Sequence, residues 1–337
     1  MRERNILVTG GAGFIGHHLV NYFVKKYRMY HVVVLDKLTY CGKLENLKEV
    51  EHCENYKFYK GDICDKELVS YILEKEKIDG IIHLAAESHV DRSIDGPMVF
   101  AETNVIGTLN LLECARTYWE TTDTKFEGKR FHHVSTDEVF GSITEGFFTE
   151  DSRYDPNSPY SASKAASDHF VRAYARTYGM PITISNCSNN YGEGQYPEKL
   201  IPFFVKRMME GKTLPVYGSG ENVRDWIYVG DHVRALDMIF HKGRDGETYC
   251  VGGGEKGLLT NNELVSKLIE AFSDTTYANF NAIKIEHVED RKGHDLRYAI
   301  DDSKIREELG YVTTTPIDIG IYRTVKWYVD NKEWLYS

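Results

Sequence analysis

A glycine-rich segment near the N-terminus constrains the fold of this 337-residue chain more than any other feature. Residues 10–16 read GGAGFIG, and they lie between an apolar run, residues 5–9, and a helical pattern that extends to about Tyr27. Glycines permit a tight turn and let backbone N–H groups approach a pyrophosphate, to which a helix N-terminus adds partial positive charge. The order of strand, glycine turn and helix therefore predicts a dinucleotide-binding unit, and the alternative is a glycine-rich turn that binds no ligand.

The second predicted strand supports the dinucleotide interpretation. Residues 31–35 are apolar and end in Asp36, which follows Gly16 by 20 positions. An acid at this distance binds the adenosine ribose hydroxyls, and its charge repels a 2′-phosphate. The sequence therefore predicts NAD in preference to NADP.

Strands and helices then alternate as far as about residue 190. Further strands are predicted at residues 56–60, 80–84, 131–134 and 181–185, with helices between them that include residues 97–120 and 160–178. This order predicts an α/β fold, a doubly wound parallel sheet of the Rossmann type. We expect residues 1–190 to bind NAD and carry the catalytic groups, and residues 191–337 to form a smaller mixed α/β unit that binds substrate, with some segments interleaved.

Two helix starts are predicted in the second half. Asp231 is expected to cap a helix that extends to about Phe240, and Thr260 with Glu263 has the spacing of a capping box.

Composition excludes several classes of function. The net charge of −10 argues against a nucleic-acid partner, and no apolar run reaches the roughly 18 residues of a membrane span. The six cysteines are scattered, which predicts neither a disulfide framework nor a zinc or other metal site and favours a cytoplasmic protein.

The first candidate catalytic group is a hydroxyl followed by two carboxyls. Thr136, Asp137 and Glu138 come just after the apolar run of residues 131–134, with Ser135 between. Ligands of open α/β sheets bind beyond the carboxyl ends of the strands, so these side chains are expected at a ligand site. A solvated turn is the alternative.

The second candidate group is a phenol beside an ammonium. Tyr160 and Lys164 are four residues apart, which places them on one face of the predicted helix. A nearby cation stabilises phenolate and so lowers the pKa of a phenol. Because this spacing is also common by chance, it indicates a catalytic role only in combination with the first candidate group.

Other polar residues follow predicted strands. Asp62 is expected to bind an adenine amine or, alternatively, to cap the helix that begins near Lys66. Ser88 is placed to bind a substrate hydroxyl, whereas His89 is more simply a structural histidine. Pro215 and Tyr217 are placed to enclose a flat base. Cations that suit phosphate, or alternatively lie scattered on the surface, are Lys199, Arg207, Arg224 and Arg291.

Together these stretches resemble the extended short-chain dehydrogenase/reductase family, and within it the nucleotide-sugar 4,6-dehydratases. The acid pair Asp137 and Glu138 is the specific signal, because epimerases and reductases of this fold keep the Tyr and Lys but lack it. Phe140 departs from the family pattern, which has Tyr there. Besides Tyr160 and Lys164, the likeness covers residues 9–16, 84–93, 135–138, 189–192, 197–202, 222–228 and 293–301.

The resemblance implies binding roles for many residues. Those implied for NAD are Gly10, Gly13, Phe14, Ile15, Gly16, Asp36, Lys37, Leu38, Thr39, Asp62, Ile63, Leu84, Ala85, Ala86, Ser88, Thr103, Tyr160, Lys164 and Asn190. Those implied for the nucleotide sugar are Ser88, Thr136, Asn189, Glu198, Lys199, Leu200, Arg207, Pro215, Val216, Tyr217, Arg224, Asn261, Arg291 and His294.

The resemblance also implies a reaction, the NAD-dependent dehydration of dTDP-glucose to a 4-keto-6-deoxy sugar, a step of deoxysugar biosynthesis. Tyr160 would take the C4 hydroxyl proton beside Thr136 and Lys164, Glu138 would remove the C5 proton, and Asp137 would protonate the leaving C6 hydroxyl. The alternatives are dehydration of another nucleotide-glucose such as UDP-glucose, a 4-epimerase, and a non-catalytic NAD-sensing protein. A homodimer through residues 97–120 and 160–178 is also expected.

Overall fold

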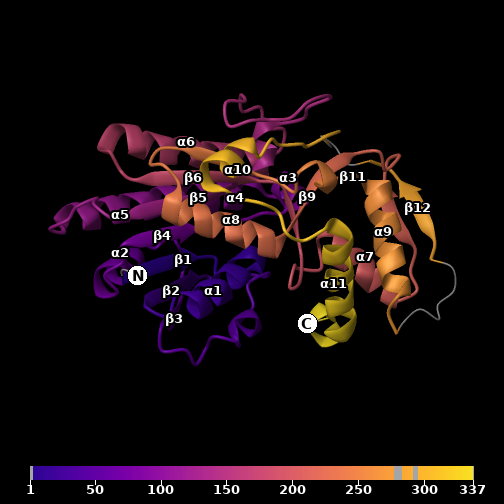
Figure 1. Cartoon of the computed structure of the whole chain (residues 1–337), viewed down its shortest axis with the longest axis horizontal. Coiled ribbons are helices and arrows are strands. Elements are labelled where there is room, and N and C mark those ends of the chain that lie inside the picture. Colours follow the sequence, from indigo (N-terminus) through magenta and orange to yellow (C-terminus); the bar gives the residue numbers. More distant parts are fainter. Residues whose placement is uncertain (1–2, 277–282, 291–294, 337) are drawn as a thin grey trace.

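A seven-stranded parallel sheet forms the larger part of the molecule (Figure 1). The computed structural model describes residues 3–276, 283–290 and 295–336. The strand order is β10-β6-β5-β4-β1-β2-β3, and neighbours in this order are parallel. The strands are β1 (Arg4–Thr9), β2 (Tyr30–Asp36), β3 (Tyr56–Lys60), β4 (Gly80–His83), β5 (Arg130–Thr136), β6 (Ile182–Cys187) and β10 (Thr248–Val251).

Helices cover both faces of this sheet because its strands are apolar on both sides. On one face Leu7 and Phe131 pack against α2 (Lys66–Lys75), α5 (Thr108–Thr121) and α6 (Pro159–Tyr178). On the other face Ile6, Val8 and Val34 pack against α1 (Phe14–Lys26) and α8 (Val229–Lys242). This arrangement confirms the predicted doubly wound α/β fold.

The strand order reverses beside β1, which pairs with β2 on one side and with β4 on the other. The turns that follow β1 and β4 therefore leave in different directions and open a crevice at the carboxyl ends of these strands. This crevice is where the sequence places the glycine turn.

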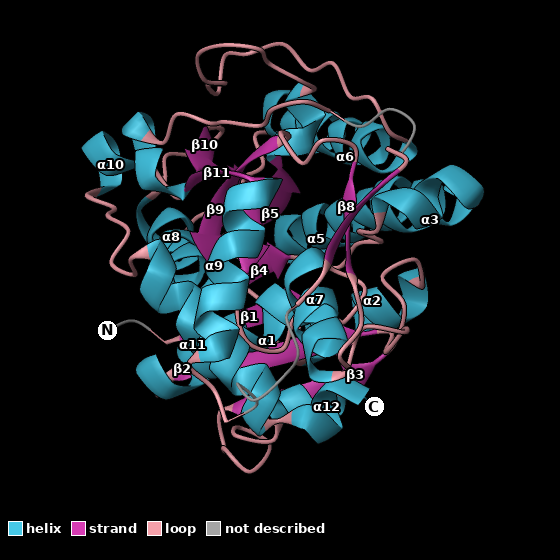
Figure 2. Ribbon diagram, turned by 90° about the vertical axis from the view of Figure 1, so that its right-hand side faces the viewer, coloured by secondary structure: helices cyan, strands magenta, loops and turns pink. Residues whose placement is uncertain are grey.

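A smaller part lies beside the carboxyl ends of the large sheet. Figure 2 shows α7 (Leu200–Met209), α9 (Asn261–Ser273) and α11 (Ile317–Asp330) in front of that sheet. These three helices share one apolar core. Two small sheets belong to this part, β11-β9-β7 and β12-β8. Their strands are β7 (Asn189–Tyr191), β8 (Leu214–Tyr217), β9 (Val223–Tyr228), β11 (Leu258–Thr260) and β12 (Ile285–Val288).

The C-terminal end of the chain returns to the N-terminal half. In the last helix, α12 (Lys332–Tyr336), Trp334 donates its indole N–H to Asn46 Oδ1 at 3.0 Å. Lys43 lies 4.5 Å from the centre of the same indole ring. The remaining helices are η1 (Leu44–Leu47), α3 (Val90–Asp95), α4 (Pro97–Phe100), η2 (Ala101–Gly107), η3 (Asp137–Phe140), η4 (Glu255–Gly257) and α10 (Ser303–Leu309).

Some local predictions are confirmed and others are wrong. Thr260 and Glu263 form the predicted capping box at α9. Asp231 does not cap α8, which begins two residues earlier, at Val229; its carboxylate instead accepts backbone N–H groups of Thr314 and Thr315. The predicted helix over residues 97–120 contains a π-helical stretch, η2, between α4 and α5.

Within the described residues, no helix combines the length and the apolar character that a membrane crossing requires.

Candidate active site

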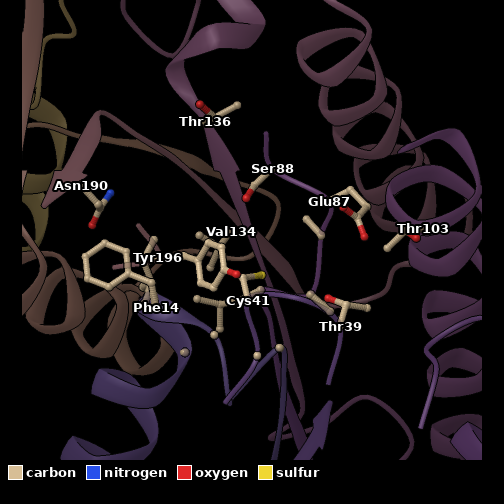
Figure 3. Close-up of a pocket in the computed structure, with 18 of the residues that line it drawn as sticks. Phe14, Thr39, Cys41, Glu87, Ser88, Thr103, Val134, Thr136, Asn190 and Tyr196 are labelled. Atoms are coloured by element: carbon tan, nitrogen blue, oxygen red, sulfur yellow. The ribbon is translucent and has the colours of Figure 1, made fainter. Parts of the chain in front are cut away.

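The first cavity lies in the crevice beside β1 and β4 (Figure 3). Phe14 and Asn190 lie on one side of it, Glu87 and Thr103 on the opposite side, and Thr136 at one end. Most residues that the family resemblance implies for NAD line this cavity: Gly10, Gly13, Phe14, Ile15, Gly16, Asp36, Lys37, Thr39, Asp62, Ile63, Leu84, Ala85, Ala86, Ser88, Thr103, Tyr160, Lys164 and Asn190.

The glycine turn is closely packed against itself and against the end of β4. Gly10 has a φ of +72°, and a Cβ there would lie 2.7 Å from the backbone nitrogen of Ala85. A Cβ on Gly16 would lie 2.1 Å from the carbonyl oxygen of Gly10. Since Gly13 directly precedes helix α1, the helix N-terminus faces the same cavity. This cradle fits the pyrophosphate of a dinucleotide.

Asp36 ends β2 beside this turn. Its carboxylate accepts the backbone N–H groups of Ala12, at 2.9 Å, and Leu38, at 2.8 Å. Burial raises the pKa of Asp36, and the two N–H groups partly offset this. The carboxylate is thereby fixed at the place where an adenosine ribose would lie.

Asp62 also lines the cavity and does not cap α2. The cap is Asp65, whose side chain accepts the backbone N–H of Leu68. Asp62 accepts the backbone N–H of Cys64 at 2.9 Å and pairs with Lys37 at 2.6 Å. The alternative interpretation of Asp62 as the helix cap is therefore wrong.

The end of β5 places a buried acid in the same cavity. Asp137 is 1% exposed; its Oδ1 accepts the Thr136 hydroxyl at 3.3 Å, and its Oδ2 has no hydrogen-bond partner within the described chain. Burial, followed by the charge of Glu138, raises the pKa of Asp137 well above its ordinary value. These surroundings therefore favour the protonated form of Asp137, which is the form that donates a proton.

Tyr160 and Lys164 enter the cavity from the first turns of α6. Ser158 and Ser161 form a capping box at this helix, and Pro159 occupies its first position. Lys164 donates to the carbonyl oxygen of Val134 at 2.9 Å, and burial lowers its pKa. The two clusters of the sequence thus meet at the end of β5.

The phenol differs from the sequence-based expectation in one respect. Burial raises the pKa of Tyr160 well above its ordinary value, and the charge of Glu138 adds to this effect, whereas the Thr136 hydroxyl opposes it. The expected lowering of the pKa by Lys164 is outweighed, because a fully buried phenolate loses its hydration.

A second cavity continues from the first into the smaller part of the molecule. Glu138 lines both cavities, so it stands at their junction. Residues from the substrate prediction that line the second cavity are Asn189, Glu198, Lys199, Leu200, Pro215, Val216, Tyr217, Arg224 and Asn261, whereas Ser88 and Thr136 line the first.

Arg224 is held firmly at this second cavity. It donates to the carbonyl oxygens of Val223 and Asp295, both at 2.8 Å, and lies 4.3 Å from the centre of the Tyr298 ring. The side chain is 5% exposed in total, so its charge faces the cavity from a fixed position.

Two predicted residues, Leu38 and Arg207, line neither cavity, and two others fall outside the described part of the chain. Leu38 is absent from both linings, and Arg207 donates to Thr213 and stacks on Phe203 instead. Arg291 and His294 lie outside the residues that the structure describes.

The structure also adds lining residues that sequence reasoning missed. Cys41, Glu87 and Tyr196 line the first cavity, and His89, Phe203 and Trp226 line the second. Position next to the predicted Ser88 was the available signal for Glu87 and His89. The apolar residues carried none, because helix and strand patterns predict them as core.

Comparison with known proteins identifies the family of this chain. A family model described as GDP-mannose 4,6 dehydratase matches residues 7–324. The dTDP-glucose 4,6-dehydratase of Escherichia coli is 50% identical over 98% of this chain and 94% of its own. The crystal structure of DesIV, a dTDP-glucose 4,6-dehydratase from Streptomyces venezuelae with NAD and TYD bound, has a TM-score of 0.88 and 47% identity, covering 98% of both chains.

Epimerases are similar at a lower level. The UDP-glucose 4-epimerase of Thermotoga maritima, solved with UDP-glucose, has a TM-score of 0.85 and 32% identity, and the match covers 97% of this chain and 99% of that one. The fold is thus common to proteins named for both activities, whereas the sequence identity is higher to the dehydratases. This chain therefore belongs to the dTDP-glucose 4,6-dehydratases of the extended short-chain dehydrogenase/reductase family.

Proposed function

We propose that this protein is a lyase that converts dTDP-glucose to dTDP-4-keto-6-deoxyglucose and water, with NAD retained and regenerated. The observation that carries the proposal is the pair Asp137 and Glu138 beside Tyr160. Asp137 is a buried acid whose pKa is raised, and Glu138 is a carboxyl at the junction of the two cavities, so the pair offers an acid and a base for elimination of water. Loss of water across C5 and C6 of a hexose requires a further base and a further acid, whereas 4-epimerisation requires only the group that takes and returns the C4 hydroxyl proton.

NAD fits the first cavity on the features of this chain. The glycine cradle excludes any Cβ at Gly10 and Gly16, and Asp36 presents a carboxylate that disfavours a 2′-phosphate. When bound, NAD supplies the acceptance of hydride from C4 of the sugar and its return to C6. We assign Lys164 to the nicotinamide ribose and Asp62 to the adenine.

The remaining chemistry is assigned to four side chains. Tyr160 accepts the proton of the C4 hydroxyl as a phenolate, the form that the positive charges of Lys164 and of a bound nicotinamide would favour against the effect of burial on its pKa. Thr136 hydrogen-bonds the forming C4 oxygen. The C4 ketone makes the C5 proton acidic, and Glu138 removes it. Asp137 donates its proton to the departing C6 hydroxyl, so water leaves and a C5–C6 double bond forms. When hydride returns to C6, Glu138 gives a proton to C5.

The second cavity is the proposed site of the nucleotide. Arg224 and Lys199 bring positive charge for the diphosphate, and Pro215 and Tyr217 bring flat apolar surface for the base. Dehydration of UDP-glucose is the alternative that differs least, because none of these contacts distinguishes thymine from uracil.

One assay separates the candidates. The protein is incubated with dTDP-glucose, UDP-glucose and GDP-glucose in parallel, and the products are identified by mass and NMR. We expect a 4-keto-6-deoxy sugar, formed fastest from dTDP-glucose. A galactose product would support a 4-epimerase, and no turnover of any of the three would support an NAD-sensing protein.

We also propose a homodimer formed by the segment of residues 97–120 and helix α6. Apolar side chains are exposed on both: Met98 is 77%, Ile106 54% and Tyr178 45% exposed. Isolated proteins rarely leave such groups on adjacent helices in water, so a second copy of the chain is the proposed partner.

We further propose that the protein is cytoplasmic and acts in deoxysugar biosynthesis. The proposed location rests on the six cysteines, which all lie in the described part of the chain and form no disulfide there. The division into a cofactor unit of residues 1–190 and a substrate unit of residues 191–337 also remains a proposal, with β10 and α8 interleaved into the larger sheet.

A further inference from the structure

Asp168 is a buried carboxylate that none of the assigned catalytic steps uses. We propose that it is a positioning residue: it fixes helix α6, which carries the phenol and the ammonium, against the end of strand β5, which carries the acid–base pair. The inference rests on the proposed function and concerns how its two halves are held in one geometry.

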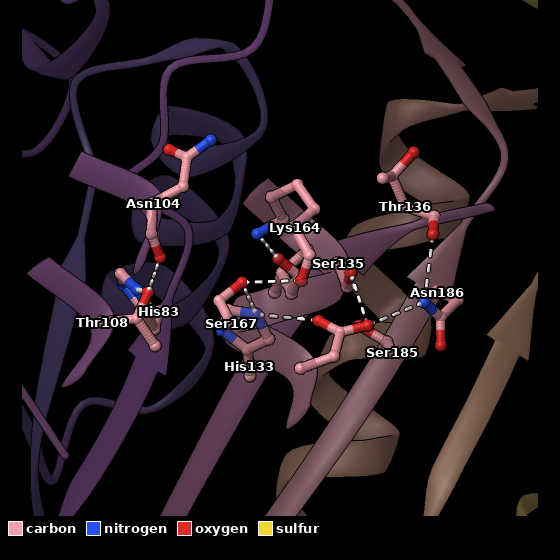
Figure 4. Close-up of polar contacts among 12 residues, drawn as sticks. His83, Asn104, Thr108, His133, Ser135, Thr136, Lys164, Ser167, Ser185 and Asn186 are labelled. Carbon is pink, nitrogen blue, oxygen red and sulfur yellow. Dashed lines mark hydrogen bonds and ion pairs between the residues drawn. The ribbon is translucent and has the colours of Figure 1, made fainter. Parts of the chain in front are cut away.

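Asp168 lies one helical turn after Lys164 and is fully buried. Its Oδ2 accepts the hydroxyl of Ser135 at 2.9 Å, the phenol of Tyr154 at 2.8 Å and the amide of Asn186 at 3.4 Å. Figure 4 shows Ser135, Asn186 and His133 close together in this region. Its Oδ1 lies 3.1 Å from His133 Nε2. A single carboxylate thus joins α6, β5, β6 and the loop before α6.

Two of these contacts lead directly to catalytic positions. Ser135 immediately precedes Thr136 in β5. Asn186 donates the same amide group to the backbone carbonyl of Thr136 at 3.0 Å. Because Asp168 orients both neighbours, it sets where Thr136 and the following Asp137 stand relative to Tyr160.

A third contact runs through the helix itself. Lys164 donates to the carbonyl of Val134, the residue before Ser135. Helix α6 is therefore bonded directly to two consecutive residues of β5, Val134 and Ser135. It is linked to the next residue, Thr136, through Asn186 of β6. A displacement of about 1 Å between catalytic groups costs on the order of 100-fold in rate, so loss of these hydrogen bonds should lower kcat.

Asp168 also balances the charge of Lys164 in this buried site. Burial lowers the pKa of Lys164, and the negative charge of Asp168 opposes that effect. The pKa of His133 is lowered to about 4 by burial, and the pKa of His83 is lowered too, so both histidines are neutral near pH 7. Lys164 is then the cation that matches Asp168.

The other titratable groups around the pair are few. Cys187 from β6 and Tyr160 from α6 face Lys164, and burial raises the pKa of each. Arg172 donates to the phenol oxygen of Tyr154 at 2.8 Å, and its charge also lowers the pKa of His133. Removal of the Asp168 charge should therefore let Lys164 lose its proton at a lower pH.

The test compares Asp168→Asn with Asp237→Asn by steady-state kinetics on dTDP-glucose across pH. Asp237 is a matched control, because it is a buried carboxylate that accepts Tyr22 and Tyr27 phenols but lies away from both cavities. For Asp168→Asn we expect kcat to fall about 10- to 100-fold with little change in KM. We also expect the alkaline limb of its pH profile to move to lower pH. Asp237→Asn should lose thermal stability but keep the wild-type kcat and profile.

A second pair keeps the proposal testable if Asp168→Asn does not fold. Ser135→Ala and Tyr154→Phe each remove one hydroxyl donor to the same Oδ2, but only Ser135 lies on the catalytic strand. We expect Ser135→Ala to lower kcat clearly more than Tyr154→Phe.

Equal effects of these two changes, or an Asp168→Asn enzyme with the wild-type kcat and pH profile, would overturn the inference. If the wild-type protein itself fails to dehydrate any nucleotide-glucose, the proposed function is wrong and the inference goes with it. The two failures are distinguished by the wild-type assay alone.

Discussion

Asp137 and Glu138 are neighbours in the chain, yet their surroundings give them different chemistry. Asp137 is buried with one oxygen unpartnered among the described residues, whereas Glu138 is half-buried at the junction of two cavities. An elimination that needs an acid and a base can therefore use two adjacent carboxyls, since their environments keep one of them protonated.

Substitutions at these residues should separate the two halves of the reaction. Tyr160→Phe removes the group that accepts the first proton, so NADH should not form when substrate is added. Glu138→Gln and Asp137→Asn leave the phenol in place, so NADH should accumulate while product formation falls roughly 10²–10⁴-fold. Absorbance of NADH in a stopped-flow experiment measures this. Near-normal turnover by Glu138→Gln would show that another group is the base.

Asp36 should decide between the two nicotinamide dinucleotides. Its carboxylate is fixed by the N–H groups of Ala12 and Leu38, so it cannot easily turn away from a 2′-phosphate. We expect wild-type protein to bind NAD more tightly than NADP, and Asp36→Asn to narrow the difference. Calorimetric titration of both dinucleotides measures this, and equal affinities in the wild type would contradict it.

At the scale of elements, the site is assembled from loops that follow parallel strands. The turn after β1, the ends of β4 and β5, and the start of α6 converge on one cavity because parallel strands end at the same edge. In the turn after β1, the glycine backbone packs so closely that a Cβ on Gly16 has no room.

Gly16→Ala should disrupt this turn. Its Cβ would lie 2.1 Å from the carbonyl oxygen of Gly10, and backbone at that distance cannot yield as a flexible side chain does. We expect lost NAD content and a lower melting temperature. Gly96→Ala is the control, because its Cβ would meet only Arg92 O at 3.8 Å. A Gly16→Ala protein that retains NAD would contradict the assignment of the cradle.

Strand β9 should make stability depend on pH through Asp225. Burial raises the pKa of Asp225 from 3.8 to about 7, although the Gly253 N–H opposes this. Between these values only the folded protein holds the proton. The free energy of unfolding contributed by this group is therefore complete below pH 3.8 and lost as the pH rises through about 7.

Denaturant unfolding of wild type and Asp225→Asn, at about pH 5 and about pH 8, tests this effect. We expect the wild type to lose stability relative to Asp225→Asn between the two conditions. The exposed Asp318→Asn change serves as a control and should show no such difference. If wild type and Asp225→Asn differ in unfolding free energy by the same amount at both pH values, the raised pKa of Asp225 would be refuted.

Sequence reasoning predicted these elements well where one pattern determines the outcome. The glycine turn, Asp36 and the strand–helix alternation depend on local geometry, so they were predictable. The π-helical stretch η2 was not, since apolar periodicity does not reveal one extra residue in a turn. Asp231 was predicted to cap a helix, but its carboxylate accepts backbone N–H groups of Thr314 and Thr315, more than 80 residues away. No local sequence pattern reveals such a contact.

At the scale of the whole molecule, the exposed apolar residues of α4, η2 and α6 predict self-association. Met98→Asp combined with Ile106→Asp should convert the proposed dimer to monomer, because buried charges at an interface are costly. Val312→Asp is the control, since Val312 is 57% exposed and belongs to the loop between α10 and α11 rather than to these helices. Light scattering at micromolar concentration gives the mass. A wild-type protein that is monomeric there would contradict the prediction.

The central claim is that one site oxidises C4, eliminates water and returns the same hydride to C6. The most direct test uses dTDP-glucose that carries deuterium at C4, with the product examined by NMR and mass spectrometry. The account predicts a 4-keto-6-deoxy product with deuterium at C6 and a solvent hydrogen at C5. A product without the label at C6, with the deuterium lost to water, would contradict it.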